Sequence, residues 1–422
     1  MSGTTRTDAG ADIEVVTTEL DPDVRVIQDT PGFAGAVAGF RRRLAQGELG
    51  NLPVLLGIAV IWTVFQLLNS RFLSPVNLTN LVLQIAAMGT IAVGIVLVLL
   101  LGEIDLSVGS VSGFTAAIMA VLNVKNGWPA VPAMLAAIVA GLLVGALQGV
   151  WITKLRVPSF VVTLAGLLAW QGALLYVLGG TGTVNITDET IIGLTDTFFG
   201  KTTSWIIAVV IVGAFVGLSM LNRVRRQRVG VPLVAMRTTV FRCFAVGVVV
   251  VGATIIFQRD RGLPLAAVIF VGFVFVFDVM TRRTRFGRHL FAVGGNAEAA
   301  RRAGISVDGV RLTVFILCSG MAAVGGILAA SRLLAVNQSS GSSDLLLNAI
   351  AAAVIGGTSL FGGRGSAWSA LLGALVIGSI ANGMDLLSVQ SSVRFMVTGA
   401  VLLLAVTIDA VSRRGRASAG RA

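Results

Sequence analysis

The uncharged stretch TNLVLQIAAMGTIAVGIVLVLLL occupies residues 79–101 and decides the class of fold. A transmembrane helix needs about 20 mostly apolar residues, and the hydrocarbon core of a bilayer is about 30 Å thick. At about 1.5 Å per residue, a helix of 23 residues is about 35 Å long. The stretch therefore predicts a helix that crosses a membrane.

The same pattern recurs along the chain and predicts an all-α polytopic membrane protein with 10 to 12 transmembrane helices. The stretch at 107–122 is the weakest candidate, because it is short and begins among polar residues. The twelve candidates are 52–68, 79–101, 107–122, 130–152, 157–178, 205–221, 240–257, 263–280, 312–330, 344–361, 366–386 and 393–410.

Composition supports a membrane protein. Of the 422 residues, 55% are hydrophobic and 12% are charged, whereas soluble domains carry about 25% charged residues. The mean hydropathy is +0.90. The net charge of +12 could suggest nucleic-acid binding, but the basic residues lie in short loops between apolar runs. We therefore expect the lipid bilayer, and no nucleic acid, as a partner.

The distribution of basic residues predicts the orientation. With the N-terminus inside, 24 of the 32 Lys and Arg residues fall in cytoplasmic segments and 7 in external ones. This bias predicts an even number of spans with both termini in the cytoplasm. The predicted organisation is a flexible N-terminal tail at 1–50, a permease domain at 51–410 with a long cytoplasmic loop at 281–311, and a basic C-terminal tail at 411–422.

Glycines give two signals in the sequence. Gly141, Gly145 and Gly149 repeat every four residues, a spacing that lets two membrane helices approach closely. The segments GEIDLSVG at 102–109 and GGTSLFGG at 356–363 each follow an inward-running span and precede an outward-running one. Their similarity is a hint of an internal repeat.

The first of these segments places two carboxylates between apolar spans. A charged group at the bilayer centre costs about 2.5–3.5 kcal/mol on insertion scales, so it should face a partner or a wet cavity. A role in the translocation path or its gating competes with ordinary loop acids at the membrane edge, and Asp105 could instead cap the next helix. The candidate path or gating residues are Glu103, Asp105, Ser107, Thr358 and Ser359.

The loop at 281–311 contains a short helix with both ends capped. Asn296 is a good N-cap, Glu298 lies in the first turn, and Gly304 can end the helix. A helix of about two turns is marginal in water by itself. Its capping favours docking into another protein over a surface helix held on lipid by its arginines. The predicted docking segment comprises Gly294, Gly295, Asn296, Ala297, Glu298, Ala299, Ala300, Arg301 and Gly304.

Five phrases resemble the bacterial monosaccharide ABC-importer permeases. They are GEIDLSVGS at 102–110, VPSFVVTLAG at 157–166, TRFGRHLFAVGGNAEAARRAGI at 284–305, AAAVIGGTSLFGGRGS at 351–366 and LLLAVTIDA at 402–410. Without the resemblance, the second of these segments, 157–166, is explained as the start of a helix. The chain is most similar to the xylose permeases, which share the extra length around 222–280 and the additional acid Glu103.

The resemblance implies a permease fold and function. It implies a homodimer in the bacterial plasma membrane, a cytoplasmic ABC ATPase subunit, and an extracytoplasmic sugar-binding protein. It also identifies 294–305 as the helix that couples to the ATPase. The expected function is import of a monosaccharide, xylose or a related pentose, by alternating access. The chain itself is expected to bind no cofactor, because ATP and Mg belong to the ATPase.

Two other classes of function are compared with this one. A self-sufficient secondary transporter or channel for a small polar solute would need no ATPase, and a secondary transporter would need coupling carboxylates at mid-membrane. A membrane-embedded enzyme would need a catalytic constellation, and none is recognisable. The tripeptide Gly200-Lys201-Thr202 lacks the first glycine of a P-loop, since Thr195 stands there. We therefore expect a translocation subunit that is not an enzyme.

Overall fold

The computed structural model describes residues 52–230 and 235–418, all of which belong to one unit, Gly50–Ala422. The expected N-terminal tail at 1–50 lies outside the described residues, as do the last four residues. The final helix, α16 (Ser391–Ser418), runs without a break past the predicted span at 393–410. Most of the predicted C-terminal tail is therefore a continuation of this helix.

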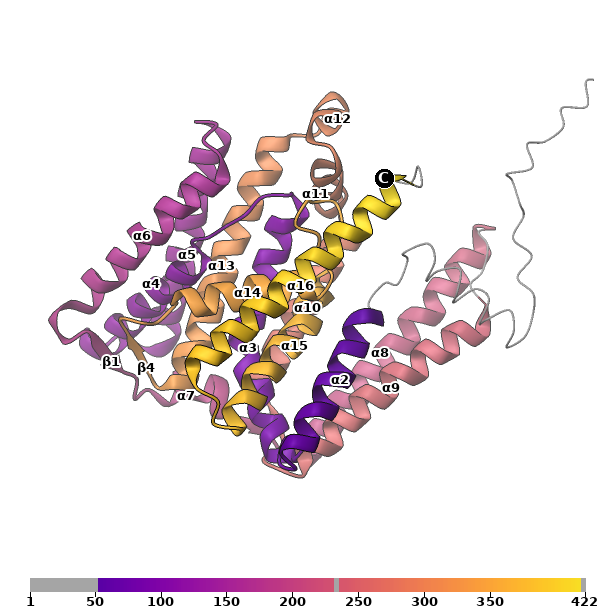
Figure 1. Ribbon diagram of the computed structural model, residues 1–422, viewed down its shortest axis with the longest axis horizontal. Helices are drawn as coiled ribbons and strands as arrows, with labels where there is room; N and C mark the ends of the chain where they lie inside the picture. Colours follow the sequence, from indigo (N-terminus) through magenta and orange to yellow (C-terminus); the bar gives the residue numbers. More distant parts are fainter. Residues whose placement is uncertain (1–51, 231–234, 419–422) are drawn as a thin grey trace, which may run out of the picture. The chain divides into compact units, whose positions relative to one another are not determined.

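Each of the twelve predicted spans is a helix, so the all-α fold is confirmed (Figure 1). Three of these helices are apolar but shorter than a full span: α2 (Leu52–Leu68), α14 (Ser343–Ile355) and the apolar part of α16, Ser391–Leu404. Within the described residues, nine are long and apolar enough to cross a membrane: α3 (Pro75–Leu100), α4 (Val108–Ala120) with η1 (Val121–Lys125), α5 (Ala130–Thr153), α6 (Ser159–Leu178), α8 (Lys201–Arg228), α9 (Met236–Gln258), α10 (Leu265–Arg283), α13 (Val307–Leu333) and α15 (Ala367–Leu386).

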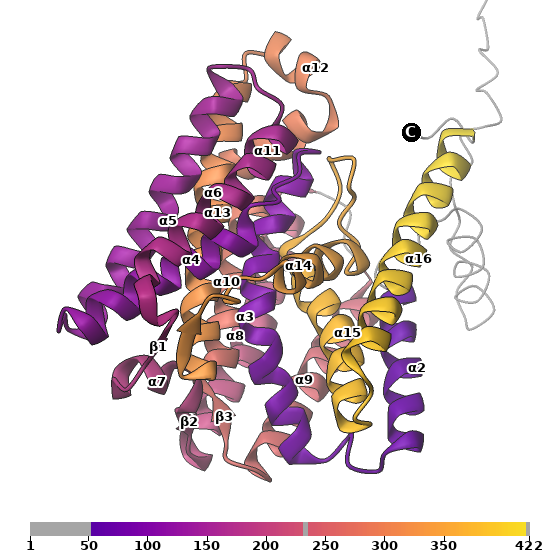
Figure 2. The same cartoon turned by 60° about the vertical axis from the view of Figure 1, so that its left-hand side comes forward.

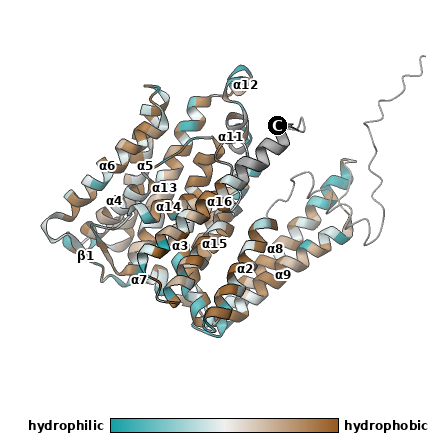
Figure 3. Cartoon of the chain, viewed as in Figure 1, coloured by the Kyte–Doolittle hydropathy of each residue, from teal (hydrophilic) through white to brown (hydrophobic). Residues whose placement is uncertain are grey.

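The helices differ in how much protein surrounds them. The apolar part of α3 is 89% buried, whereas those of α8 and α9 are 11% buried. Helix α3 is therefore a central element, and the α8–α9 hairpin presents its side chains outward. Figure 3 shows hydrophobic residues along the helices and hydrophilic ones at α12 (Ala297–Arg302) and at the tip of this hairpin.

The glycine spacing in α5 has the predicted role. A Cβ atom at Gly145 would overlap the backbone of Phe315 in α13, and one at Gly141 would crowd Ser319. Gly149 faces Leu312 in the same helix. The absence of side chains at these three positions lets α5 and α13 pack backbone to backbone.

Two pairs of short strands, which the sequence did not predict, join the ends of distant helices. Strand β1 (Thr183–Asn185) pairs with β4 (Ala335–Asn337), and β2 (Phe198–Phe199) pairs with β3 (Leu263–Pro264). Helix α7 (Glu189–Asp196) lies between β1 and β2 and was also not predicted. These elements lie at one end of the helices, the strand end, as Figures 1 and 2 show.

The opposite end carries α11 (Arg285–Gly295) and α12, and we call it the α12 end. The loops predicted to share one side of the membrane with 281–311 all lie there. These loops follow α3, α5, α8 and α14, because each of these helices starts at the strand end. The alternation of the predicted spans is therefore present in the fold.

Candidate functional site

Two of the α-helices, α4 and α14, are 13 residues long and adjoin non-helical chain. Helix α4 is preceded by the segment 101–107, and α14 is followed by the segment 356–366. Non-helical backbone at membrane depth is tolerated where protein covers it. Gly102 lies against the backbone of Phe361 and Gly362, so the two segments that resemble one another in sequence meet in space.

A third glycine segment joins this meeting point. A Cβ atom at Gly294, near the end of α11, would overlap the carbonyl oxygen of Leu100. The amide of Gly363 donates a hydrogen bond to the same oxygen at 2.9 Å. The end of α3, the end of α11 and the 356–366 segment therefore touch through backbone atoms alone. We call this contact the glycine junction.

Gly294 and Gly295 were predicted as part of the docking segment, ahead of its N-cap Asn296. In the structure they form the last residues of α11, and the break between α11 and α12 falls at Asn296. The physical reason is the glycine junction, because no side chain fits between α11 and Leu100. The spacing of residues in the sequence does not indicate such a contact.

The capped helix itself is confirmed as α12, Ala297–Arg302. The Asn296 side chain accepts a hydrogen bond from the amide of Ala299 at 2.9 Å. At the other end, Gly304 has φ +82° and the amide of Ile305 bonds to the carbonyl of Ala300, which completes a Schellman cap. Both ends of this short helix are therefore closed by the chain's own groups.

One face of α12 is exposed and the other is not. Glu298 is exposed and forms ion pairs with Arg301 at 3.3 Å and Arg302 at 3.2 Å. Ala299 is exposed, whereas Ala300 is buried in the permease's own core. Docking through Ala300 is therefore excluded in this conformation, because that methyl group already has partners within the chain.

Glu103 connects three elements near the α12 end. Its Oε1 lies 2.9 Å from Nη2 of Arg311 in α13, and its Oε2 accepts a hydrogen bond of 2.5 Å from the hydroxyl of Ser159 in α6. The exposed fractions of the Arg311 and Glu103 side chains are 26% and 17%. This shielding makes the ion pair stronger than a surface pair. Arg311 lies close behind α12, so the contact joins the docking loop to the 101–107 segment.

Asp105 is buried and belongs to a separate polar network. Its Oδ1 accepts hydrogen bonds from the backbone amide of Ser107 at 2.9 Å and from the Ser107 hydroxyl at 2.6 Å. That hydroxyl also contacts the side chain of Gln148 in α5. Among the described residues, no nitrogen or oxygen donor reaches Oδ2, although the weak donor Cys318 faces the carboxyl. Burial raises the pKa of Asp105, and the hydrogen bonds from Ser107 offset part of the rise.

The last two predicted path residues lie in the 356–366 segment. Thr358 is buried and its hydroxyl lacks a hydrogen-bond partner among the described residues. The Ser359 hydroxyl accepts from the amide of Phe361 at 3.2 Å. The five predicted residues thus form parts of two facing segments, but none of them lines the cavity described next.

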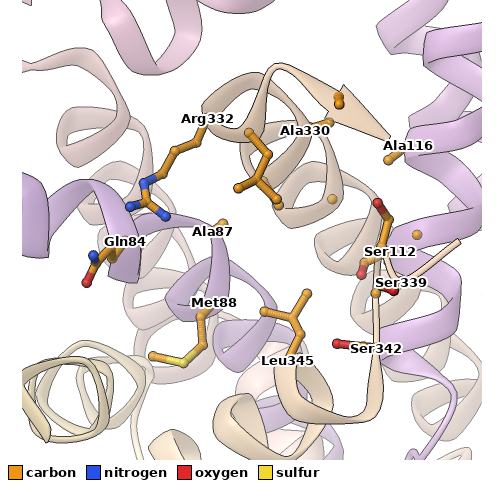
Figure 4. A pocket seen from close by; sticks show the side chains of 17 residues that line it. Gln84, Ala87, Met88, Ser112, Ala116, Ala330, Arg332, Ser339, Ser342 and Leu345 are labelled. Carbon is orange, nitrogen blue, oxygen red and sulfur yellow. The ribbon is translucent and has the colours of Figure 1, made fainter. Parts of the chain in front are cut away.

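A cavity of about 220 Å³ lies between α3, α4, α13 and the start of α14 (Figure 4). Arg332 and Gln84 lie on one side, and hydroxyl groups lie on the other. In the described part of the chain, Arg332 has no ion-pair or hydrogen-bond partner. The remaining polar side chains that line the cavity are Ser112, Ser339, Ser340 and Ser342, and no acid lines it.

Glycines let the segments that line the cavity pack closely against one another. A Cβ atom at Gly113 would overlap the carbonyl of Ser340, and Gly341 has φ +72° and packs on Gly109. The loop that carries Ser339, Ser340 and Ser342 therefore packs directly on α4. No group of three His, Cys, Asp or Glu side chains in residues 52–230 and 235–418 could hold a metal ion.

The profile of the family described as "Branched-chain amino acid transport system / permease component" matches residues 77–406. The chain belongs to this permease family. The match begins in α3 and ends in α16, so it covers both facing segments, the cavity and the α12 end. A permease is a translocation subunit and not an enzyme.

Individual relatives of the permease are sugar permeases. The chain is 39% identical to the xylose transport system permease protein XylH of Escherichia coli over 86% of this chain and 93% of that one. Identity to XylH of Haemophilus influenzae is 36%, over 86% and 98%. Identity to the ribose import permease protein RbsC of Bacillus subtilis is 31%, over 86% and 94%. No solved structure matches the chain.

Sequence reasoning missed the partners of the predicted residues in the permease. Arg311 was counted among loop cations, Ser159 was treated as part of a helix start, and Arg332 as an external charge. Gln148 was not singled out, although an uncharged polar residue within an apolar span is a usable signal. The other partners carry no local signal, because their contacts join residues far apart in the chain.

Proposed function

We propose that this permease is the membrane subunit of an ATP-driven importer that carries xylose or a related pentose into the cell by alternating access. The order of identities supports the substrate, at 39% to the E. coli xylose permease and 31% to the ribose permease of B. subtilis. The family description names branched-chain amino acids instead. The chemistry of the cavity helps to decide between these substrates.

The cavity lining suits a neutral sugar better than an amino acid. Its serine hydroxyls, its amide and its arginine can donate to or accept from sugar hydroxyls. A zwitterionic amino acid would also bring an ammonium group, and no acid lines the cavity to pair with it. A desolvated charge without a partner is costly. The lining therefore favours a polyhydroxylated, uncharged substrate.

The observation that carries the proposal is the contact of α11 with both facing segments. An external ATPase can move membrane helices through a rigid element that it grips, and α12 is short, capped at both ends and exposed on one face. Helix α11 ends one residue before α12 and touches Leu100 and Gly363. The segments at this junction lead into α4 and from α14, and both helices line the cavity.

Coupling then follows a continuous path. A displacement of α12 moves α11, the glycine junction transfers the displacement to the two segments, and α4 and α14 shift against α3 and α13. Packed interfaces of this kind switch between discrete arrangements rather than deform gradually. Glu103, Asp105, Ser107, Thr358 and Ser359 lie in the moving segments, so their assigned role is gating rather than contact with the sugar.

The proposal includes the partners of the importer. They are a second copy of the permease, a cytoplasmic ABC ATPase that binds ATP and Mg, and an extracytoplasmic sugar-binding protein. The location is the bacterial plasma membrane, with the α12 end and both termini in the cytoplasm. The cationic α12 end supports this orientation, because cytoplasmic loops are enriched in Lys and Arg.

Reconstitution of the permease with its ATPase and binding protein in liposomes tests the proposal. Labelled xylose should accumulate when ATP is present on the ATPase side, and ribose and leucine should accumulate more slowly. Uptake by the permease alone under an ion gradient would assign a secondary transporter instead. ATP-driven uptake of leucine but not of pentoses would exclude the sugar assignment.

A further inference from the structure

The α8–α9 hairpin carries a basic pocket that the transport path does not use. The pocket has a volume of about 210 Å³ and lies between the two helices near the hairpin tip. Three arginines line it, Arg223 and Arg226 from α8 and Arg242 from α9. Three neutral polar side chains line it as well: Ser219, Asn222 and Thr239.

The positive charge of the hairpin has no counterpart within the hairpin. Residues 201–258 contain seven Lys and Arg and no Asp or Glu. The nearest acids in sequence, Asp196 and Asp260, lie at the strand end, which is the far end of both helices. Within the described part of the chain, Arg226 and Arg242 form no ion pair or hydrogen bond. The guanidinium groups of Arg226 and Arg242 share one pocket and therefore repel one another unless an anion lies between them.

Depth in the membrane distinguishes the pocket from an ordinary cationic loop. Arg242 is six residues into α9, about 9 Å along the helix from Met236. Arg226 is in the last turn of α8. The pocket therefore extends from the tip toward the level where lipid phosphates meet the acyl chains.

Apolar side chains lie at the pocket and on the exposed faces of the two helices beside it. Phe215 of α8 lines the pocket and is 36% exposed, and Phe241 and Phe244 of α9, which do not line it, are 71% and 69% exposed. The buried residues of both helices are confined to the strand end: Ser204, Ala208, Thr254 and Phe257. Within the described part of the chain, the tip half of the hairpin has no buried residue, so we expect lipid to be its solvent.

We propose that this pocket binds the phosphate headgroup of an anionic phospholipid. Arginine forms paired hydrogen bonds with phosphate oxygens, and hydroxyl and amide groups can bind the remaining headgroup oxygens. Basic pockets between membrane helices hold anionic headgroups in this manner. The bound lipid neutralises the arginines and fastens the outward-facing hairpin to the bilayer.

Two double variants with equal loss of charge test the site. Arg226→Gln/Arg242→Gln removes pocket arginines, and Arg225→Gln/Arg228→Gln removes tip arginines that do not line the pocket. Binding of phosphatidylglycerol to the purified full chain is measured by native mass spectrometry. The pocket variant should lose about 30-fold in affinity, equivalent to about 2 kcal/mol at about 1 kcal/mol per arginine. The tip variant should stay within about twofold, as exposed charges outside the contact do.

Two further measurements complete the test. Competition with inorganic phosphate shows whether the pocket is specific for a lipid, and a conservative variant is available if the glutamine variant does not fold. Inorganic phosphate in large excess should not displace the lipid, because it has no acyl chains to contact Phe215 and the exposed apolar faces of α8 and α9. Displacement would show a general anion site and overturn the lipid assignment. If the glutamine variant does not fold, Arg242→Lys keeps the charge and should still lose about tenfold, since lysine lacks the paired geometry. Equal losses in the pocket and tip variants, or no loss in either, would also overturn the proposal.

Discussion

Two carboxylates, two residues apart in the chain, have different surroundings and should behave differently. Glu103 is ion-paired to Arg311 and is partly exposed, whereas Asp105 is buried and its carboxylate oxygens have unequal hydrogen bonding. The first carboxylate holds elements together in its charged form. The second pays a desolvation cost for its charge. Neutralising each of them should therefore have different consequences.

Glu103→Gln should destabilise the α12 end. The substitution leaves Arg311 without its anion, and hydrogen bonds to charged groups contribute about 1.5–3 kcal/mol to the free energy of unfolding. We expect a lower melting temperature and reduced uptake. A double-mutant cycle with Arg311→Gln should give a coupling of about 1–3 kcal/mol, because the two side chains contact each other. Purely additive effects would show that the ion pair is incidental.

Asp105→Asn should keep the fold and lose transport. Asparagine retains an oxygen for Ser107 and removes a charge whose burial raises the pKa of the carboxyl. The variant should be at least as stable as the wild type at pH 7. The difference in unfolding free energy between the variant and the wild type should narrow as the pH falls through the raised pKa of Asp105 toward 3.8, because protonation of Asp105 then removes the same charge from the wild type. Uptake should fall severalfold. In the gating role that we propose, Oδ2 of Asp105 accepts a hydrogen bond in another state of the gate, and the NH2 group that replaces it in asparagine cannot accept one.

The readouts for Asp105 separate gating from a structural role. Asp105→Ala removes the acceptor of Ser107 and should cost about 1–3 kcal/mol of unfolding free energy. Glu189→Gln, which replaces an exposed acid in the first turn of α7, is the control: it should leave uptake unchanged and cost less than about 1 kcal/mol of unfolding free energy. Asp188 is a poor control because it caps α7 through the amides of Thr190 and Ile191. Normal uptake in Asp105→Asn would exclude gating by this carboxyl.

At the scale of the element, α12 has one face for a partner and one for the permease. Ala299→Trp adds bulk on the exposed face and should weaken ATPase binding. Overpacking an interface costs about 1–3 kcal/mol, which corresponds to a loss of about five- to hundred-fold in affinity. Glu298→Arg should act in the same direction, because it puts a positive charge in the first turn. Pull-down of the ATPase and sugar uptake are the measurements.

Ala300→Trp is the internal contrast to this experiment. Ala300 is 5% exposed and packs in the core of the permease, so its replacement should lower the stability of the permease itself. Ala299→Trp should leave the melting temperature of the isolated permease unchanged. If Ala299→Trp bound the ATPase normally and transported normally, α12 would be a surface helix lying on lipid.

The glycine junction offers a second test with a neighbouring control. Gly294→Ala places a methyl group against the Leu100 carbonyl, while a Cβ at Gly295 meets nothing within 4 Å. Gly294→Ala should therefore force α11 away from both facing segments. We expect ATPase binding to persist while sugar moved per ATP falls several-fold, and Gly295→Ala should transport normally. Equal behaviour of the two variants would remove the junction from the coupling path.

At the scale of the whole molecule, the features that the sequence predicted are those that depend only on residues close together in the chain. Apolar length predicted every span, and cap residues predicted α12, because both are local properties. The strand pairs, the contact of Glu103 with Arg311 and the cavity around Arg332 depend on residues brought together by folding. Glycine spacing occupied an intermediate place, since it predicted a close helix contact in α5 without naming its partner α13.

The orientation of the molecule is the remaining prediction, and it concerns every loop together. The strand end and the α12 end lie at opposite ends of the helices, so one labelled position on each side determines the whole topology. Asn126 lies at the strand end and Asn296 at the α12 end, and both are exposed. Cysteine placed at either position is therefore accessible to a reagent that is present on its side of the membrane.

The experiment uses a background in which Cys243 is replaced by alanine, and Cys318 is retained because it is buried. A membrane-impermeant maleimide added to intact cells should label Asn126→Cys and leave Asn296→Cys unlabelled. Permeabilisation should expose the second position. The expectation follows from the excess of Lys and Arg at the α12 end, because such residues are retained on the cytoplasmic side. Labelling of Asn296→Cys in intact cells would invert the molecule, place α12 outside, and remove it from the reach of any cytoplasmic ATPase.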